Sequence, residues 1–457
     1  MSKPQFKVLS PTAILGYGFP EESFLKGMAE NPDLIAVDAG SVDPGPYYLG
    51  SGKSFTDRIG VKRDLRYMLT HGVRAKVPVV IGTAGGSGAR PHVEWCREII
   101  EEIAREEGLD FTMGIVYADI PKDVVNTAIR AGKTSPLDDL PELTEADVAA
   151  CPHLVAQMGV EPIQKLLAQG VDVVLAGRAY DPVCFSSLPI MKGYDAALAT
   201  HMGKIIECAA IASDPGSGAD AVLGILTEDS FILQTLSPIR KFTARSTAAH
   251  SLYEKSDPYH LPGPGGMLDL TNVTFTELEG GRVEVKGTTF IPSDPYRIKL
   301  EGASVVGFRT ISIAGIHDPI MIASIDEILV QVKARVDDLL AKEKVEAQVF
   351  FHVYGKNGVM GGLEHHAPLA PHELGIVLEV LAPTQAQADT VCSITRSTLL
   401  HYGYTGRIAT AGNLAFPFSP SDVRMGECFK FAIYHLMDVE DPSEHFKSEI
   451  VHVKSGR

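Results

Sequence analysis

The chain has 457 residues, and its hydrophobic fraction of 45% and charged fraction of 21% are ordinary for a globular protein. This length exceeds what one hydrophobic core usually serves, so we expect two domains. The formal net charge of -16 argues against nucleic acid and anionic lipid as partners, because both repel an acidic protein.

The start of the chain and its cysteines predict a cytoplasmic protein. Residues 1–10 lack the cationic and apolar stretches of a signal peptide, and no apolar run of about 18 residues is present that would cross a membrane. The six cysteines are scattered without a CxxC pair, which fits neither a disulfide framework nor a thiolate zinc site. We therefore expect reduced cysteines that serve mainly in packing.

The first half of the chain alternates short apolar runs with amphipathic stretches. Parallel strands need crossovers of this length, so the pattern predicts a parallel-sheet α/β domain over residues 1–256 that binds the ligand. The expected strands are 34–38, 77–81, 111–117 and 171–175, and the expected helices are 64–74, 92–107, 122–131 and 161–169.

A change of architecture is expected after residue 256. The proline- and glycine-rich stretch 257–266 is unsuited to a helix or a central strand, and the segments flanking Glu279-Gly-Gly281 predict a β-hairpin. Residues 257–302 are therefore expected to form a linker and hairpin region.

The remaining residues, 303–457, predict a ferredoxin-like α+β domain. Strand and helix patterns follow one another in the order βαββαβ, which is the ferredoxin-like order. The helix expected at 385–401 has one apolar side that would cover a sheet, and we expect an exposed face of this domain to mediate assembly into an oligomer. The expected strands are 305–313, 347–354, 374–382 and 428–436, and the other expected helix is 323–341.

The clearest local pattern is a glycine-rich turn between the strand at 77–81 and the following helix. Its glycines allow close approach of the backbone, and the helix N-terminus adds a partial positive charge, so the turn can cradle an anion. A tight crossover turn without a ligand is the alternative. The spacing is not that of a dinucleotide fingerprint, because Ala84 stands at its second glycine position, which disfavours NAD-dependent redox chemistry. The expected ligand-binding residues are Gly82, Thr83, Gly85, Gly86, Ser87 and Gly88.

Two further turns follow strands. Asp38 and Asp43 are candidate acid or base groups and Lys53 a counter-charge, although Tyr47 at the first glycine position excludes the spacing of a phosphate loop. Arg178 is a candidate clamp for a carboxylate, with Asp181 beside it, and an Arg178–Asp181 ion pair that only shapes the turn is the alternative. Ligands of open α/β sheets bind beyond the carboxyl ends of strands, so the three turns should converge.

A histidine-rich segment in the second half is a weaker candidate. Adjacent residues on an extended strand point to opposite faces, so neighbouring histidines rarely share one metal ion, and no HExxH spacing is present. We therefore expect no metal and no other cofactor, and interpret the segment as a ligand lid or an oligomer contact. Its residues are Glu364, His365, His366 and His372.

Several unusual strings resemble the acyclic terpene utilisation AtuA-like family. They are Gly16-Tyr-Gly-Phe-Pro20, Val37 to Gly40, Asp43 to Gly52, Gly177-Arg178, Lys299 to Gly302 and Gly412 to Asp422. The resemblance covers most of the chain. It implies a catabolic context in which branched acyl-CoA thioesters are processed, and a small separate partner subunit. It leaves open whether the substrate is a CoA thioester or a free carboxylic acid.

These features lead to two functional hypotheses. The first is a cofactor-independent lyase, hydratase or isomerase acting next to a carboxylate or thioester carbonyl, which needs an anion cradle, a carboxylate base and a cationic clamp. The second is a non-catalytic subunit that binds acyl-CoA or supports the small partner. No GxSxG turn is present to indicate covalent hydrolase chemistry.

Overall fold

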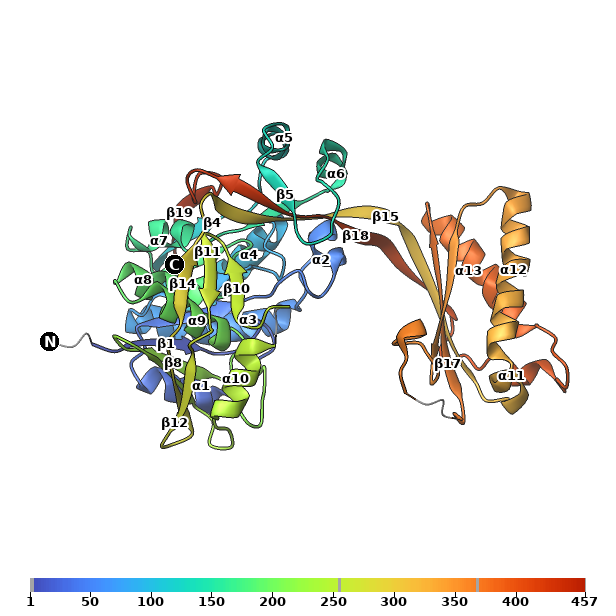
Figure 1. Ribbon diagram of the computed structural model, residues 1–457, viewed down its shortest axis with the longest axis horizontal. Coiled ribbons are helices and arrows are strands. Elements are labelled where there is room, and N and C mark those ends of the chain that lie inside the picture. The colour runs from blue at the N-terminus through green and yellow to red at the C-terminus, as the bar shows by residue number, and fades with distance from the viewer. Residues whose placement is uncertain (1–3, 254–255, 367–369, 457) are drawn as a thin grey trace. The chain divides into compact units, whose positions relative to one another are not determined.

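A computed structural model describes residues 4–253, 256–366 and 370–456. The chain divides into two compact units, which Figure 1 shows as ribbons. The first contains residues 1–304 and 431–457, and the second contains residues 305–430. Each unit has its own β-sheet and its own apolar core.

The first unit is built on a ten-stranded sheet whose five central strands are parallel, which confirms the predicted α/β class. These strands are short, apolar and buried on both faces, as parallel strands in α/β proteins usually are. In sheet order they are β1 (Phe6–Ser10), β2 (Leu34–Asp38), β3 (Val79–Gly82), β7 (Val173–Ala176) and β4 (Phe111–Val116).

Antiparallel strands extend both edges of this sheet. The predicted hairpin around Glu279 is confirmed, and it lies at one end of the sheet, paired with β9. The last strand of the chain pairs with β4 at the other end. The added strands are β8 (Val222–Leu226), β9 (Phe231–Thr235), β12 (Thr274–Leu278), β13 (Arg282–Lys286) and β19 (Ser448–Val453).

Helices cover the two faces of the parallel strands. Apolar side chains of α1 (Glu21–Ala29), α3 (Arg58–Ala75) and α4 (Arg90–Glu107) join one core cluster with alternate strand residues. The helices α7 (Glu161–Leu167) and α8 (Val183–Met191) contact the same strands outside this cluster and so cover the opposite face. The chain therefore leaves β3 toward one face and leaves the adjacent β7 toward the other. Such a switch point is where open α/β sheets bind ligands.

The remaining elements of the first unit are shorter. Residues 257–266, expected as a linker, contribute to a three-stranded sheet in the order β10, β11, β14. The helices are α2 (Pro46–Ser51), α5 (Lys122–Arg130), α6 (Glu145–Ala150), α9 (Ala196–Ile206) and α10 (Ala244–Leu252), and the strands are β5 (Thr134–Pro136), β6 (Leu154–Gln157), β10 (His260–Gly263), β11 (Gly266–Asp269) and β14 (Thr289–Pro292).

The second unit has the predicted ferredoxin-like order. Its strands lie in the sheet order β16, β17, β15, β18, with β17 antiparallel to both β15 and β16. The predicted core face of α13 is also confirmed, because Ala388, Val391, Cys392, Thr395 and Leu399 are buried. The elements are β15 (Tyr296–Ile316), α11 (Pro319–Ala323), α12 (Ile325–Glu343), β16 (Gln348–Tyr354), β17 (Leu374–Ala382), α13 (Gln385–Leu400) and β18 (Asp422–Val439), with single 3-10 turns at Gly361–Leu363 and Thr410–Gly412.

The units do not follow the predicted boundaries residue by residue. Residues 257–302 belong to the first unit, and residues 431–457 return to it from the second. The division into separately folding domains at residues 257 and 303 stays a prediction.

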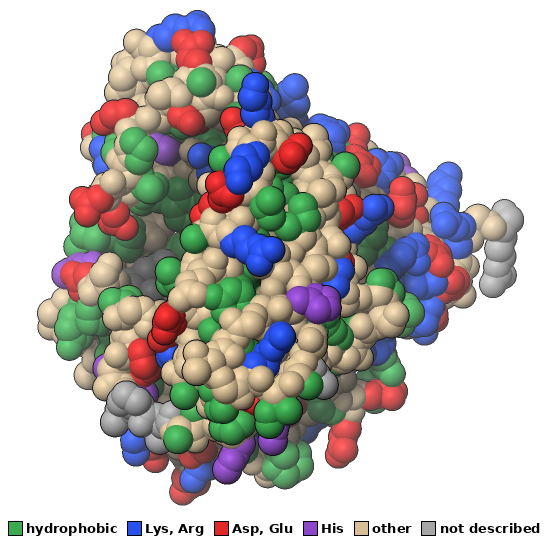
Figure 2. Space-filling model, turned by 90° about the vertical axis from the view of Figure 1, so that its right-hand side faces the viewer, with side chains coloured by type: hydrophobic (Ala, Val, Ile, Leu, Met, Phe, Trp, Pro, Cys, Tyr) green, Lys and Arg blue, Asp and Glu red, His purple; other side chains and the backbone are tan. Residues whose placement is uncertain are grey.

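The described part of the chain contains no helix with the length and apolar character needed to cross a membrane. The face of the molecule drawn in Figure 2 carries acidic, basic and apolar side chains interspersed, without a large area of one charge.

Candidate functional site

The three predicted turns lie side by side at the carboxyl ends of β2, β3 and β7. The amide of Ala39 donates to the Gly82 carbonyl at 2.8 Å, and the amide of Arg178 donates to the Gly88 carbonyl at 3.1 Å. The packing requires glycine, because a Cβ atom built on Gly88 would lie 2.1 Å from the Arg178 nitrogen. The predicted convergence of these turns is therefore present in the structure.

The glycine-rich turn after β3 is held mainly by its own hydrogen bonds. The amide of Thr83 donates to Gly177, the amide of Gly86 to Thr83, and the amide of Gly88 to Ala84. Thr83 adopts φ 47°, an unusual conformation for a β-branched residue and one that often marks functional sites. Ser87 is buried and its Oγ has no hydrogen-bond partner among the described residues. Because several amides are engaged internally, anion binding by this turn stays a prediction.

Asp38, the last residue of β2, is the most unusual carboxyl group of this region. Its side chain is 4% exposed, and Oδ1 has no hydrogen-bond partner in the described part of the structure. Burial and the nearby carboxylates of Asp181 and Glu207 raise the pKa of Asp38 well above its ordinary value, and Arg178 and the Thr83 hydroxyl only partly oppose this rise. Asp38 therefore holds its proton to a higher pH than an ordinary aspartate does.

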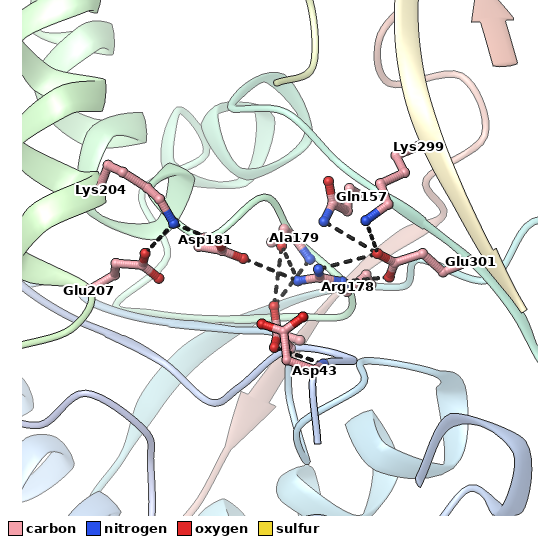
Figure 3. A network of polar contacts seen from close by, with 11 residues as sticks. Asp43, Gln157, Arg178, Ala179, Asp181, Lys204, Glu207, Lys299 and Glu301 are labelled. Carbon is pink, nitrogen blue, oxygen red and sulfur yellow. Dashed lines mark hydrogen bonds and ion pairs between the residues drawn. The ribbon is translucent and has the colours of Figure 1, made fainter. Parts of the chain in front are cut away.

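Lys204 on α9 lies between two further carboxylates, as Figure 3 shows. Its Nζ is 3.2 Å from Asp181 Oδ2 and 2.6 Å from Glu207 Oε1. Burial alone would raise the pKa of Asp181, but Lys204 and Arg178 lower it to about 2. Asp181 is therefore ionised in the same surroundings in which Asp38 favours its neutral form.

Each of the three side-chain nitrogens of Arg178 donates to a partner within the protein (Figure 3). Its Nε and Nη2 donate to Glu301 at 2.7 and 3.4 Å, and its Nη1 donates to the Ala179 carbonyl at 2.8 Å and to Asp181 at 3.3 Å. The side chain is only 3% exposed. The expected Arg178–Asp181 pair is therefore present, and the guanidinium fork faces Glu301 instead of solvent. A role of Arg178 as a substrate clamp stays a prediction that this geometry does not favour.

Glu301 on β15 accepts hydrogen bonds from other residues of the network. It is fully buried, and it accepts from Lys299 Nζ at 3.0 Å and from Gln157 Nε2 at 3.4 Å. Burial alone would raise the pKa of Glu301, but Arg178 and Lys299 lower it. Lys299 Nζ also lies 3.6 Å from the centroid of the Tyr434 ring, a cation–π contact.

The charges of this network balance when one carboxyl group is neutral. Three cations face four carboxyl groups, and Asp38 is the one among them whose pKa is raised by burial and by the neighbouring carboxylates. The cations are Arg178, Lys204 and Lys299, and the carboxyl groups are Asp38, Asp181, Glu207 and Glu301.

Two predicted catalytic residues lie apart from these contacts. Asp43 is exposed, and its amide donates to Ser41 Oγ at 3.1 Å. Lys53 is exposed, and its Nζ donates to the Tyr47 hydroxyl at 3.3 Å. Neither side chain forms an ion pair with Asp38, Arg178 or Asp181 among the described residues. Their assignment to the catalytic group stays a prediction.

The sequence interpretation missed Lys204, Glu207 and Glu301. A pattern was available for the first two, because they are spaced i, i+3 at the C-terminal end of a buried, mostly apolar helix. Glu301 lies 123 positions from Arg178 in the sequence, and only the pairing of β15 with β6 brings it to the site. The contact between Glu301 and Arg178 could therefore not be predicted from the sequence alone.

The histidine segment differs from the expectation in one respect. His365 and His366 precede β17 outside any strand, and their ring centroids are 4.2 Å apart, so the expectation that they point to opposite faces is wrong. Together with Glu364 they place ligand atoms within 4.8 Å of one another, but all three are exposed. The positions between 366 and 370 lie outside the described residues.

Most side chains of the carboxyl-end network are buried. A cavity of about 390 Å³ instead lies at the amino ends of the parallel strands, with Phe6, Lys76, Val77, Asp172 and Lys192 among its lining residues. This cavity does not include any residue of the network. Of the four carboxyl groups of the network, Asp181 is the most exposed, with 18% of its side chain accessible.

Comparison with protein-family models shows to which family the chain belongs. The sequence model of the acyclic terpene utilisation family protein AtuA matches residues 59–217 and 240–416, which is more than half of the chain. The chain belongs to the AtuA family. The matched residues include Arg178, Asp181, Lys204, Glu207 and Glu301, whereas Asp38 precedes the first matched segment. Comparison with curated proteins and with solved structures finds no significant match.

Membership of the AtuA family implies a role in acyclic terpene catabolism. The resemblance noted in the sequence is thereby confirmed.

Proposed function

We propose that this AtuA-family chain is an enzyme, a lyase, hydratase or isomerase, that acts on a small carboxylic acid or a branched acyl-CoA in catabolism. The observation that carries this proposal is Asp38: a buried carboxyl group at the switch point of the sheet, with an unpartnered oxygen and a raised pKa. Carboxyl groups perturbed in this way are typical of catalytic acids and bases.

The chemistry proposed is proton transfer next to a carbonyl group. A carboxyl group with a pKa nearer neutrality both donates and accepts a proton efficiently, so Asp38 would protonate a leaving hydroxyl or abstract a proton from carbon. The ion pairs of Lys204 with Asp181 and Glu207 hold fixed charges beside it. Fixed dipoles and charges need no rearrangement when charge develops in a transition state.

The experiment has two stages. Thermal shift with branched acyl-CoA thioesters and with di- and tricarboxylates identifies ligands, because binding to the folded state raises its stability. Turnover is then measured for the wild type, Asp38→Asn and Asp123→Asn. Asp123 is an exposed aspartate on α5 outside the network and serves as the control.

Loss of a general acid or base lowers the rate by about 10²- to 10⁴-fold, so we expect this loss in Asp38→Asn and near wild-type turnover in Asp123→Asn. Equal turnover in Asp38→Asn and the wild type would remove Asp38 from the reaction.

A non-catalytic role is the second candidate, and one observation favours it. Asp38 and Arg178 are only 4% and 3% exposed, so the network is sealed as it stands. A subunit that binds acyl-CoA elsewhere, or that supports a small partner protein within an oligomer, needs no open site here. Ligand binding that is unchanged in Asp38→Asn, with no turnover by the wild type, would favour this alternative.

A further inference from the structure

We propose that Asp38, Asp181 and Glu207 form a binding site for a divalent cation of the oxygen-preferring class, such as Mg²⁺ or Mn²⁺. Each residue places one carboxylate oxygen within 4.8 Å of the others. Oxygen ligands lie about 2.0–2.6 Å from such cations, so one ion at the centre reaches all three. The residues come from three separate elements: the end of β2, the turn after β7 and the end of α9.

A second observation, independent of the clustering, also points to a ligand. Asp38 is more than nine-tenths buried, and its Oδ1 has no hydrogen-bond partner among the described residues. Buried polar atoms in folded proteins are nearly always satisfied, so each exception indicates a missing ligand, water or proton. One carboxylate oxygen of Asp38 lies within 4.8 Å of those of Asp181 and Glu207, so an ion held by the cluster would give the Asp38 carboxylate a partner.

Lys204 occupies part of the same space. Its ammonium group lies 3.2 Å from Asp181 and 2.6 Å from Glu207, where it neutralises two of the three carboxylates. A divalent ion therefore competes with this ammonium group. Lys204→Met removes the competing charge and is expected to strengthen cation binding. If Lys204 served only to stabilise the fold, this substitution would not strengthen cation binding.

A proton competes as well. The charged and titratable groups that face Asp38 are Asp181, Glu207, Arg178 and Cys184, with the Thr83 hydroxyl beside them. Carboxylate ligands must be deprotonated to bind a cation, so cation binding releases protons and becomes tighter as the pH rises. The three ligands of the cluster are all carboxylate oxygens, which favours a cation that prefers oxygen over a thiophilic one.

The test uses the full chain and Mn²⁺ as the probe. Free Mn²⁺ is followed by electron paramagnetic resonance during titration at pH 6 and pH 8, with circular dichroism to show that each variant is folded. The variants are Asp38→Asn, Glu207→Gln and Lys204→Met. Glu364→Gln is the matched control, because Glu364 belongs to the exposed cluster with two histidines, the other group of possible ligands.

We expect one ion per chain, bound more tightly at pH 8. Removal of one ligand should weaken binding by about tenfold or more, Lys204→Met should strengthen it, and Glu364→Gln should leave it unchanged. The proposal is overturned if wild type and Lys204→Met both fail to bind Mn²⁺ at millimolar concentration, or if binding is lost in Glu364→Gln and retained in Asp38→Asn. If Asp38→Asn does not fold, Glu207→Gln and Lys204→Met decide the matter in the same way.

This inference concerns ion binding and does not depend on the reaction proposed above. Mn²⁺ binding without any turnover would support the ion site while the proposed function fails. Turnover that depends on Asp38 without Mn²⁺ binding would give the reverse result.

Discussion

Removal of the negative charge of Glu301 should destabilise the first unit strongly. Glu301→Gln keeps the shape of the side chain but leaves Lys299 without its carboxylate partner and Arg178 with Asp181 alone. Glu301 is fully buried and Arg178 is 3% exposed, so solvent screens little of this loss. Breaking a buried ion pair by removing one partner costs about 3 to 5 kcal/mol. We expect the lower end, about 3 kcal/mol, because glutamine retains one acceptor oxygen.

The chain offers a convenient assay and a matched control. Trp95 is its single tryptophan and lies on α4 in the first unit, so its fluorescence during urea titration reports the unfolding of that unit. Glu145→Gln is the control. Glu145 forms two hydrogen bonds of 2.8 Å with Arg130, the same chemistry as the Arg178–Glu301 pair, but both side chains are exposed. Exposed ion pairs contribute little to stability.

The two variants should therefore separate clearly. Glu301→Gln should lower the urea midpoint and the melting temperature, the latter by roughly 6 °C at about 2 °C per kcal/mol, and Glu145→Gln should change neither measurably. If the two substitutions have equal effects, the buried network contributes no more than a surface pair, and the reasoning is refuted.

Three further predictions concern the same region. The pKa of Asp38 is raised in the folded state, so the protein loses stability as the pH rises from about 4 to that raised value, by about 1.4 kcal/mol for each pH unit of the interval. Asp38→Asn should therefore have a higher melting temperature than the wild type at pH 8. This difference should vanish below pH 4. Asp181 has a pKa lowered to about 2, so its ionised form should add about 2 kcal/mol to the free energy of unfolding above pH 4, and this contribution should disappear as the pH falls to 2. The urea midpoint of Asp181→Asn should not show this loss of stability in acid. Gly88→Ala should destabilise far more than Gly108→Ala, since both glycines have positive φ but only the new methyl at Gly88 would collide with the Arg178 backbone; similar urea midpoints would contradict this steric argument.

The fold class and the proximity of the three turns could be predicted from the sequence, because both follow from local patterns. Short apolar runs separated by amphipathic stretches indicated parallel strands, and the turns after β2, β3 and β7 met as the geometry of such sheets requires. Asp38 and Arg178 were found in this way. The βαββαβ order of the second unit and the core face of α13 rest on the same kind of local information.

The partners of these residues depend on contacts between distant segments, which a single sequence does not show. Arg178 was expected to face a ligand, but its guanidinium group donates to Glu301 instead. The pairing of β15 with β6 brings Glu301 to this position. Lys204 and Glu207 reach the site because α9 packs nearby and buries its charged residues. The return of β19 to pair with β4 is likewise a pairing between segments more than 300 residues apart.

The raised pKa of Asp38 is the property on which the proposed chemistry depends, and a direct titration of its carboxyl carbon tests it. Uniform labelling of aspartate with ¹³C at the carboxyl carbon, compared between wild type and Asp38→Asn, isolates the Asp38 resonance during a pH titration. The account predicts a transition well above the ordinary aspartate value of about 4, with Asp38 still protonated where the other aspartates have ionised. A transition at or below about 4 would contradict it, because Asp38 would then be an ordinary carboxylate and the four carboxyl groups of the network would all be ionised together.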